Sequence, residues 1–262
     1  MRQPDRHVTR VAGHLGEWLQ GRLGPAGPVA LITLCCPALG VATCAPPGRL
    51  AVPPAARARF ARALGVPLPD LGLSADMPPG GGAGVSTAAL VALARAAGVV
   101  DPARVAAACL AVEGATDPLM LPRPDAVLWA PREARALSDV PQPGRAEIVG
   151  GFLGPVERTD PSDDRFPDIS DLVARWCEGP RTLRAQAALA AVSAERTTAL
   201  RGPADDPVAR LARDLGALGH VRAHTGSARG LVFSPGTAPA AALEALASLG
   251  ATGVIGFATG TP

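Results

Sequence analysis

Hydrophobic and polar positions follow two periods along this chain. Short stretches rich in Val, Ile, Leu and Thr predict β-strands. These stretches lie at residues 7–12, 28–34, 72–78, 146–154 and 251–260, with a strand pair around residues 223–236. The first two flank a glycine-bearing segment, "GHLGEWLQGRLG", so we expect the chain to begin as a hairpin.

Longer segments carry apolar residues three and four positions apart, which predicts helices. These segments are residues 53–65, 86–98, 101–114, 168–179, 181–202, 206–219 and 238–250. Their ends carry the expected signals: Asp101 is placed to cap a helix, Pro102 suits its first turn, and Gly114 stops it.

Turn residues also divide the chain. The stretch "PQPG" at 141–144 precedes a new strand and predicts a boundary near residue 145, giving domains at residues 1–145 and 146–262. In each half the order of strands and helices suits an α+β arrangement, a sheet with helices on one face.

Composition narrows the classes of function. The chain has 262 residues, a net charge of +2 and scattered arginines, so we expect no nucleic acid and no membrane surface as partner. All 25 basic residues are arginine. The lack of lysine excludes Schiff-base catalysis and the lysine of a Walker A loop.

Five cysteines form no CxxC pair, which predicts reduced thiols in a cytoplasmic protein. The N-terminal residues lack the apolar core of a signal peptide, and no run approaches the 18 apolar residues of a membrane span. We therefore expect a soluble, untargeted protein.

The stretch "ADMPPGGGAGVSTAALVALARAAG" (75–98) places a glycine loop directly before a helix. Such a loop is suited to bind phosphate, because the first N–H groups of a helix are unpaired and carry partial positive charge. Ser86 and Thr87 add hydroxyls for phosphate or Mg²⁺. A simple tight turn is the structural alternative.

Three well-known loops fit this stretch poorly. A P-loop needs a lysine, and a Rossmann loop needs G-x-G-x-x-G, which "GGGAGVS" does not form. A serine nucleophile elbow needs glycine two residues after the serine, where this chain has Ala88.

The loop "PPGGGAGVSTAA" resembles the P-x-x-x-G-L-G-S-S-x-A motif of the GHMP kinases. The residues in register are Pro78, Gly82, Gly84, Ser86, Thr87 and Ala88. Ala83 and Val85 depart from the pattern, and Val85 removes one hydroxyl from the phosphate site.

Two further segments resemble motifs of the same family. "AGHLGEWLQG" is similar to the "GELIQG" variant found in L-threonine kinases of cobalamin synthesis, with Gly16, Glu17, Leu19, Gln20 and Gly21 in register. "AHTGSARGLVF" is similar to the third family motif, with His224, Thr225, Gly226, Ser227 and Gly230 in register. The resemblance extends over residues 8–235.

The resemblance implies a two-domain α+β GHMP kinase fold, with an N-terminal half like domain 2 of ribosomal protein S5 and a ferredoxin-like C-terminal half. It also implies ATP and Mg²⁺ as cofactors. The residues expected at ATP are Pro79, Gly80, Gly81, Gly82, Ala83, Gly84, Val85, Ser86 and Thr87.

Two acids near "EGATDPLM" are candidates for the chemistry. Asp117 resembles the family aspartate beside the substrate hydroxyl, and its alternative is a turn-forming residue before Pro118. Glu113 is a candidate metal ligand together with Ser86, or else a solvated glutamate at a helix end.

The resemblance implies L-threonine, or a similar hydroxy amino acid, as the phosphate acceptor, and a homodimer is possible. The residues expected to bind the acceptor are His14, Glu17, His224 and Thr225, with Arg229 as a further candidate for an anion. Another GHMP kinase, such as a homoserine kinase, and a catalytically silent binding protein of the same fold remain alternatives.

The segment "DPSDDRFPD" (160–168) concentrates acids. It lacks the glycine and distal glutamate of an EF-hand, so a Ca²⁺ loop is excluded. A solvated acidic loop is the expectation, with a substrate lid as the alternative.

Overall fold

The computed structural model describes residues 8–157 and 160–260 of the chain. The strands are β1 (Arg10–Arg22), β2 (Val29–Cys44), β3 (Gly72–Ala75), β4 (Val127–Ala130), β5 (Arg135–Asp139), β6 (Glu147–Phe152), β7 (Gly219–Arg222), β8 (Ala228–Phe233) and β9 (Thr252–Ala258). The helices are α1 (Pro54–Leu64), α2 (Val85–Ala96), α3 (Pro102–Glu113), α4 (Ser170–Glu178), α5 (Leu183–Arg201), α6 (Val208–Asp214) and α7 (Ala241–Ser248), with a short 3₁₀ turn at Pro124–Ala126.

The strands join in one sheet of nine, in the order β5-β4-β2-β1-β7-β8-β6-β9, with β3 paired to β2. The predicted hairpin is confirmed, because β1 and β2 pair antiparallel. Instead of one sheet in each half, strands from both sides of residue 145 are continuous, since β1 also pairs with β7 through Glu17 and Arg222. The division into two domains at residue 145 stays a prediction.

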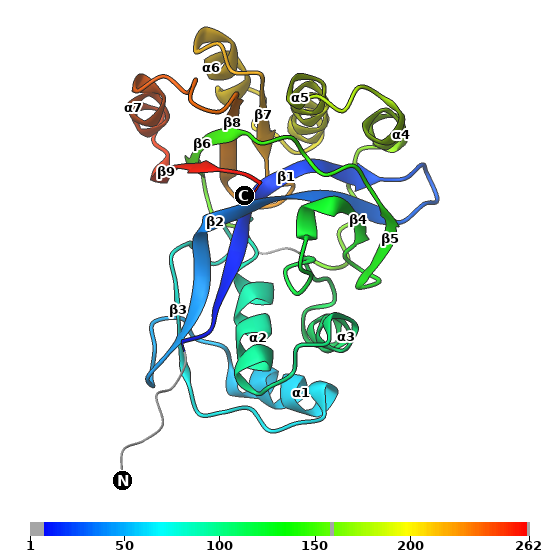
Figure 1. Ribbon diagram of the computed structural model, residues 1–262, viewed down its shortest axis with the longest axis vertical. Helices are drawn as coiled ribbons and strands as arrows, with labels where there is room; N and C mark the ends of the chain where they lie inside the picture. The colour runs from blue at the N-terminus through cyan, green and yellow to red at the C-terminus, as the bar shows by residue number, and fades with distance from the viewer. Residues whose placement is uncertain (1–7, 158–159, 261–262) are drawn as a thin grey trace.

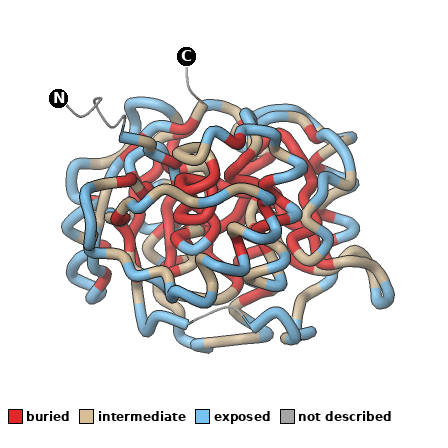
Figure 2. The backbone as a smooth tube through the Cα atoms, turned by 90° about the horizontal axis from the view of Figure 1, so that it is seen from below, coloured by how far each residue is buried: buried red, intermediate tan, exposed pale blue. Residues whose placement is uncertain are grey.

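The helices form two groups on either side of the long β1–β2 hairpin. Figure 1 shows α1, α2 and α3 below the hairpin and α4, α5, α6 and α7 above it. Buried chain is concentrated in the middle of the molecule, and the exposed segments surround it (Figure 2). The alternation of strands and helices in the sequence thus predicts an α+β fold correctly.

Helix α2 is the most buried helix of its group. Nine of its residues, from Val85 to Ala94 with the exception of Ser86, are buried, so the helix is surrounded by protein on all sides. Its alanine-rich sequence permits this close approach to β1 and β2, because small side chains keep the helix near the sheet. The N-terminus of α2 is therefore held firmly, with the glycine loop in front of it.

Strands β1 and β2 are longer than predicted. Alternation of apolar and polar residues is lost in β1, where His14 through Leu19 are all buried, and the glycines there resemble a turn. Both faces of the strand are covered by helices, so a continuous buried run replaces the alternation.

The remaining expectations concern thiols and membranes. Each of the five cysteines, all within the described residues, is a free thiol. Across the described ranges, the helices are too short or too polar to cross a lipid bilayer. The strand predicted at residues 7–12 begins at His7, which lies outside the described residues.

Candidate functional site

The glycine loop before α2 is held through its carbonyl groups. Gly16 N–H donates to Gly82 O and His14 N–H donates to Ala83 O, both at 3.2 Å. From the third motif, the N–H groups of Ser227 and Ala228 donate to Gly81 O at 3.0 and 2.8 Å. All three sequence motifs therefore meet at this loop.

While the carbonyl groups of the loop accept hydrogen bonds, its last three N–H groups have no hydrogen-bond acceptor among the described residues. Within the described part of the chain, the N–H groups of Gly82, Ala83 and Gly84 donate no hydrogen bond, and neither do those of the first three residues of α2. Gly80, Gly82 and Gly84 all have positive φ, the conformation that lets successive N–H groups converge. Loop and helix together form a cradle suited to an anion.

Two hydroxyls and one carboxyl group adjoin this cradle. Thr87 Oγ1 donates to Glu113 Oε2 at 3.0 Å. Burial raises the pKa of Glu113 to about 7, although the hydrogen bonds from Ser86 and Thr87 favour the ionised carboxylate and oppose this rise. The structure thus brings together Ser86 and Glu113, the two residues predicted to bind Mg²⁺, from the start of α2 and the end of α3.

A β-bulge in β1 builds the opposite wall of the site. His14 pairs with Cys35 and Glu17 with Thr33, so three steps along β1 match two along β2. Gly16, with φ of 68°, absorbs the extra residue. In a regular strand, side chains three positions apart lie on opposite faces; the bulge brings His14 and Glu17 to the same one.

The imidazole of His14 lies between two carboxyl groups. Its Nδ1 is 3.2 Å from Glu17 Oε1, and its Nε2 is 3.3 Å from Asp117 Oδ2. The three groups place possible metal-ligand atoms within 4.8 Å of one another. Because the carboxyl groups face opposite nitrogens of one ring, the arrangement suits ion pairs and not one shared metal ion.

Burial and charge shift the pKa values of this cluster. Burial alone lowers the pKa of His14, but the carboxyl groups of Glu17 and Asp117 raise it to about 9. Burial raises the pKa of Glu17 to about 8, although the His14 charge opposes that shift. Near neutral pH an imidazolium therefore lies beside Asp117.

These shifts predict how stability changes with pH. Between pH 7 and 9 the folded chain holds protons on His14 and Glu17 that the unfolded chain has released, so stability falls as pH rises. We expect the free energy of unfolding, measured with urea, to drop by roughly 3–4 kcal/mol over this window. Glu17→Gln should make that drop smaller, and an equal drop in the variant would contradict the assignment.

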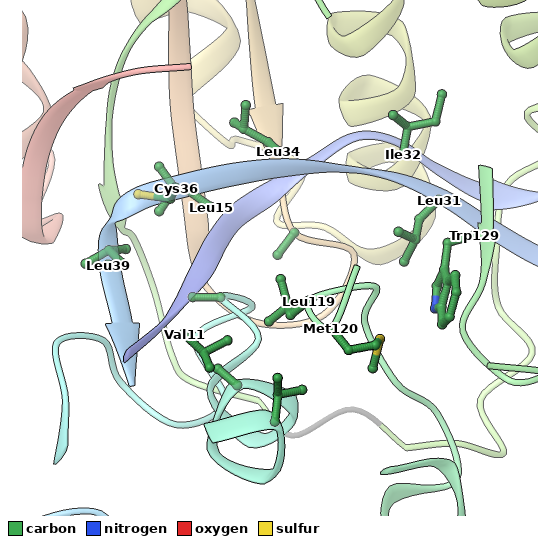
Figure 3. Packing of buried hydrophobic residues seen from close by; sticks show 14 of the residues in the cluster. Val11, Leu15, Leu31, Ile32, Leu34, Cys36, Leu39, Leu119, Met120 and Trp129 are labelled. Atoms are coloured by element: carbon green, nitrogen blue, oxygen red, sulfur yellow. The ribbon is translucent and has the colours of Figure 1, made fainter. Parts of the chain in front are cut away.

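Asp117 is fixed by the residues around it. Trp129 Nε1–H donates to Thr116 O at 2.6 Å, and Asp117 N–H donates to Thr87 Oγ1 at 3.3 Å. Leu119 and Met120, directly after Pro118, are buried among core residues of β1 and β2 (Figure 3). The Asp117 carboxylate, 25 % exposed, is thus held on a rigid support at the cavity wall.

The third motif contributes a second buried imidazole. The ring of His224 stacks on Phe166 with centroids 3.8 Å apart, and its Nε2 lies 2.7 Å from Arg201 Nε. Burial and the Arg201 charge lower the pKa of His224 to about 3, so the ring is neutral. Its Nδ1 is buried and has no partner among the described residues.

These groups line one cavity of about 480 Å³. Its apolar lining residues, called the apolar end below, include Leu50, Val52, Pro53, Ala56, Leu90 and Val112. Its polar end is the set His14, Glu17, Gln20, Asp117, Arg132, Phe166, His224 and Thr225, which the ion pairs of His14, the Gln20–His224 hydrogen bond and the ring contacts of Phe166 connect. The glycine loop, Ser86, Thr87 and Glu113 lie along the same cavity.

The structure brings nearly all the predicted site residues to this cavity, and Gly81 is the exception among them. Arg229, the further candidate for an anion, does not line it: its guanidinium is buried against Asp206 at 2.8 Å. Sequence reasoning missed Arg132 and Phe166, which carry no motif, and left Gln20 without a role although it lies in the first motif.

The expectation of a solvated acidic loop at 160–168 is only partly correct. Asp160, Asp164 and Asp168 are exposed, but Asp163 is paired with the buried Arg201, and Phe166 and Pro161 line the cavity. Arginines from distant segments hold the loop against the protein, which local composition does not reveal.

No protein-family model matches the sequence, and no curated protein is similar to it. Solved structures are similar in fold over almost the whole chain. The mevalonate kinase of L. major, in complex with R-mevalonate, matches with a TM-score of 0.61 at 14 % identity, covering 98 % of each chain. The homoserine kinase of Cytophaga hutchinsonii matches with a TM-score of 0.53 at 16 % identity, covering 98 % of this chain and 95 % of that one. The chain has the α+β fold of the GHMP kinases.

Proposed function

We propose that this protein is an ATP-dependent kinase that phosphorylates the side-chain hydroxyl of L-threonine, giving O-phospho-L-threonine for the aminopropanol arm of cobalamin synthesis. One observation carries the kinase assignment: three separate glycine motifs converge on a cavity that is lined by both an anion cradle and a carboxylate, Asp117. The choice of threonine rests on the resemblance of the first motif, and the fold supports a small-molecule kinase in general.

The residues present fit a nucleotide. The unpaired N–H groups of Gly82, Ala83 and Gly84, with the N-terminus of α2, suit the phosphates of ATP. Val85, which replaces a family serine, is buried with the core, so its backbone N–H and not its side chain serves the cradle. The apolar end of the cavity suits the adenine ring.

The residues also fit Mg²⁺, since Ser86 and Glu113 offer oxygen ligands beside the cradle. Thr87 orients the Glu113 carboxylate through its hydrogen bond. When bound, Mg²⁺ neutralises charge on the phosphates. The chain lacks lysine, so N–H groups, a helix terminus and this metal site supply the positive potential around the phosphates.

At the polar end, Asp117 accepts the proton of the acceptor hydroxyl. The imidazolium of His14, 3.3 Å from the Asp117 carboxylate, pairs with that carboxylate and orients it. Glu17 Oε2 and His224 Nδ1 are buried without a partner among the described residues. We assign these two atoms to the polar groups of the acceptor, because a buried polar atom is costly when left unpaired. Thr225 lines the same cavity and is a further candidate contact for the acceptor.

The metal assignment predicts a specific defect. Glu113→Gln removes a charged oxygen ligand, so we expect the Mg²⁺ concentration for half-maximal activity to rise about tenfold or more. The matched control is Glu157→Gln, because Glu157 also lines the cavity but is exposed and distant in sequence from the cluster. An unchanged Mg²⁺ requirement in Glu113→Gln would refute this role.

The function itself is tested by direct assay. Purified protein with Mg·ATP is offered L-threonine, L-serine and L-homoserine, and the phosphorylated product is quantified. Preference for threonine supports the proposal. Preference for homoserine would favour the alternative of a homoserine kinase, with which the chain shares its fold. ATP binding without transfer to any of the three would indicate a silent binding protein.

A further inference from the structure

The acidic segment 160–168 contributes Pro161 and Phe166 to the cavity lining and is anchored by hydrogen bonds from Arg22 and Gly24. Arg22 N–H donates to Pro167 O at 2.8 Å, and Gly24 N–H donates to the Asp168 carboxylate at 3.1 Å. At its centre, the carboxylate of Asp164 accepts hydrogen bonds from both Arg22 and Arg132, at 3.0 and 2.9 Å. The segment thus holds two guanidinium groups from distant parts of the sequence.

Of these two, Arg132 is the one that faces the site. It follows β4, lines the cavity and lies over the Phe166 ring, 5.4 Å from the centroid. Two of its N–H groups donate to Asp164 Oδ1 and to Asp163 O. A guanidinium has five N–H groups in a planar fork, so three are left to bind an anion.

The other arginines near this end are already engaged. Arg201 pairs with Asp163 and contacts His224, and its side chain is 6 % exposed. Arg222 and Arg229 are buried around Asp206 and do not line the cavity. Arg59 lines the apolar end, where it donates to Val112 O. In the part of the chain that the structure describes, Arg132 is the guanidinium available at the polar end.

The polar end thus offers one residue suited to a positive group of the acceptor, Glu17, and one suited to a negative group, Arg132. Glu17 Oε2, buried and unpartnered within the described residues, can accept a hydrogen bond from an ammonium group, whose positive charge favours the ionised form of this carboxyl group. Arg132 is a donor suited to a carboxylate. We propose that Arg132 binds the carboxylate of the acceptor and so makes the enzyme select zwitterionic hydroxy amino acids over amino alcohols. This inference rests on the proposed function and assigns the residue that decides its substrate class.

Three acceptors that differ by one group each test the inference. L-Threonine carries both charges, (R)-1-amino-2-propanol lacks only the carboxylate, and (R)-3-hydroxybutyrate lacks only the ammonium group. We expect the wild-type protein to phosphorylate threonine with a kcat/KM at least about 30-fold above that for the amino alcohol, because the amino alcohol cannot accept charged hydrogen bonds from Arg132.

Arg132→Gln should raise the KM for threonine about 30-fold and leave kcat/KM for the amino alcohol unchanged. Arg132→Lys keeps the positive charge but loses the planar guanidinium, so its KM for threonine should lie between that of the wild type and that of Arg132→Gln. Arg22→Gln is the matched control: it removes the other guanidinium on Asp164 but does not touch the cavity, so the KM for threonine should stay within about twofold of wild type.

The outcomes separate this inference from the function on which it rests. If wild-type protein phosphorylates threonine but uses the amino alcohol equally well, or if Arg132→Gln weakens both acceptors alike, the inference is overturned and the kinase assignment stands. If Arg132→Gln fails to fold, the selectivity of the wild-type protein between the two acceptors still decides. If wild-type protein phosphorylates neither, the proposed function and the inference fail together.

Discussion

Asp117→Asn should lower kcat by about a thousandfold, because a positioned general base contributes on that order to proton transfer. Asparagine keeps the shape and the neighbouring contacts of the side chain but cannot take the proton of the acceptor hydroxyl. The affinity for ATP, measured by isothermal titration, should stay close to wild type. The affinity for ATP should not change because the N–H groups that are proposed to bind the phosphates belong to Gly82, Ala83 and Gly84, and not to Asp117.

Asp76→Asn is the matched control for this change. Asp76 is a half-exposed carboxylate, paired with Arg10 at 2.7 Å and absent from the cavity lining. It should retain wild-type turnover, as expected for an exposed ion pair. Turnover within tenfold of wild type in Asp117→Asn would show that its carboxylate only orients the acceptor or plays no part in the chemistry.

Gly82→Ala should abolish tight ATP binding and destabilise the fold by several kcal/mol. A Cβ at residue 82 would lie 2.3 Å from Ala223 Cβ and 2.7 Å from Thr225 O, and the φ of 77° is itself unfavourable for alanine. Backbone strain costs about 1 kcal/mol, and overpacking adds about 1–3 kcal/mol. Urea denaturation measures the stability loss, and titration with an ATP analogue measures the binding loss.

Gly98→Ala separates the two causes. Gly98 has a similar φ of 80°, but a Cβ there would meet nothing within 4 Å. This variant should lose only about 1 kcal/mol and bind ATP normally. If the two variants behaved alike, close contact between the loop and the third motif would not be what shapes the cradle.

Much of the fold follows from local signals in the sequence. Helix α1 was expected at residues 53–65 and occupies Pro54–Leu64, because proline suits a first turn and Gly65 takes the left-handed conformation that ends the helix. Helix α3 is capped by the Asp101 side chain, which accepts from Arg104 N–H. Such signals act within a few residues, so a single sequence reveals them.

The pairing of strands is less accessible to prediction. The joining of β1 to β7 depends on residues more than 200 positions apart, Glu17 and Arg222. Each half, considered alone, therefore resembles a separate sheet. Short strands such as β5, with mostly exposed residues, carry no clear hydrophobic pattern of their own and depend on their partner strand.

In the candidate site, too, some residues are predictable from the sequence and others only from the fold. Its glycine motifs are visible in the sequence, because close backbone approach requires glycine: a Cβ at Gly226 would lie 2.6 Å from Gly81 C and Gly82 N. Arg132 and Phe166 have no such signature. One of 25 arginines becomes a candidate only when the fold places it in the cavity.

The extra residue in β1 has a consequence for comparing this chain with others. A chain that gained one residue opposite this interval, between Thr33 and Cys35 of β2, could pair the two strands regularly and keep its strands and helices, yet the alternation of β1 would then carry His14 and Glu17 to opposite faces. The acid–imidazole–acid cluster would then be lost without any change of residue type. In alignments of distant relatives, the number of residues in this short interval is therefore as informative as their identity.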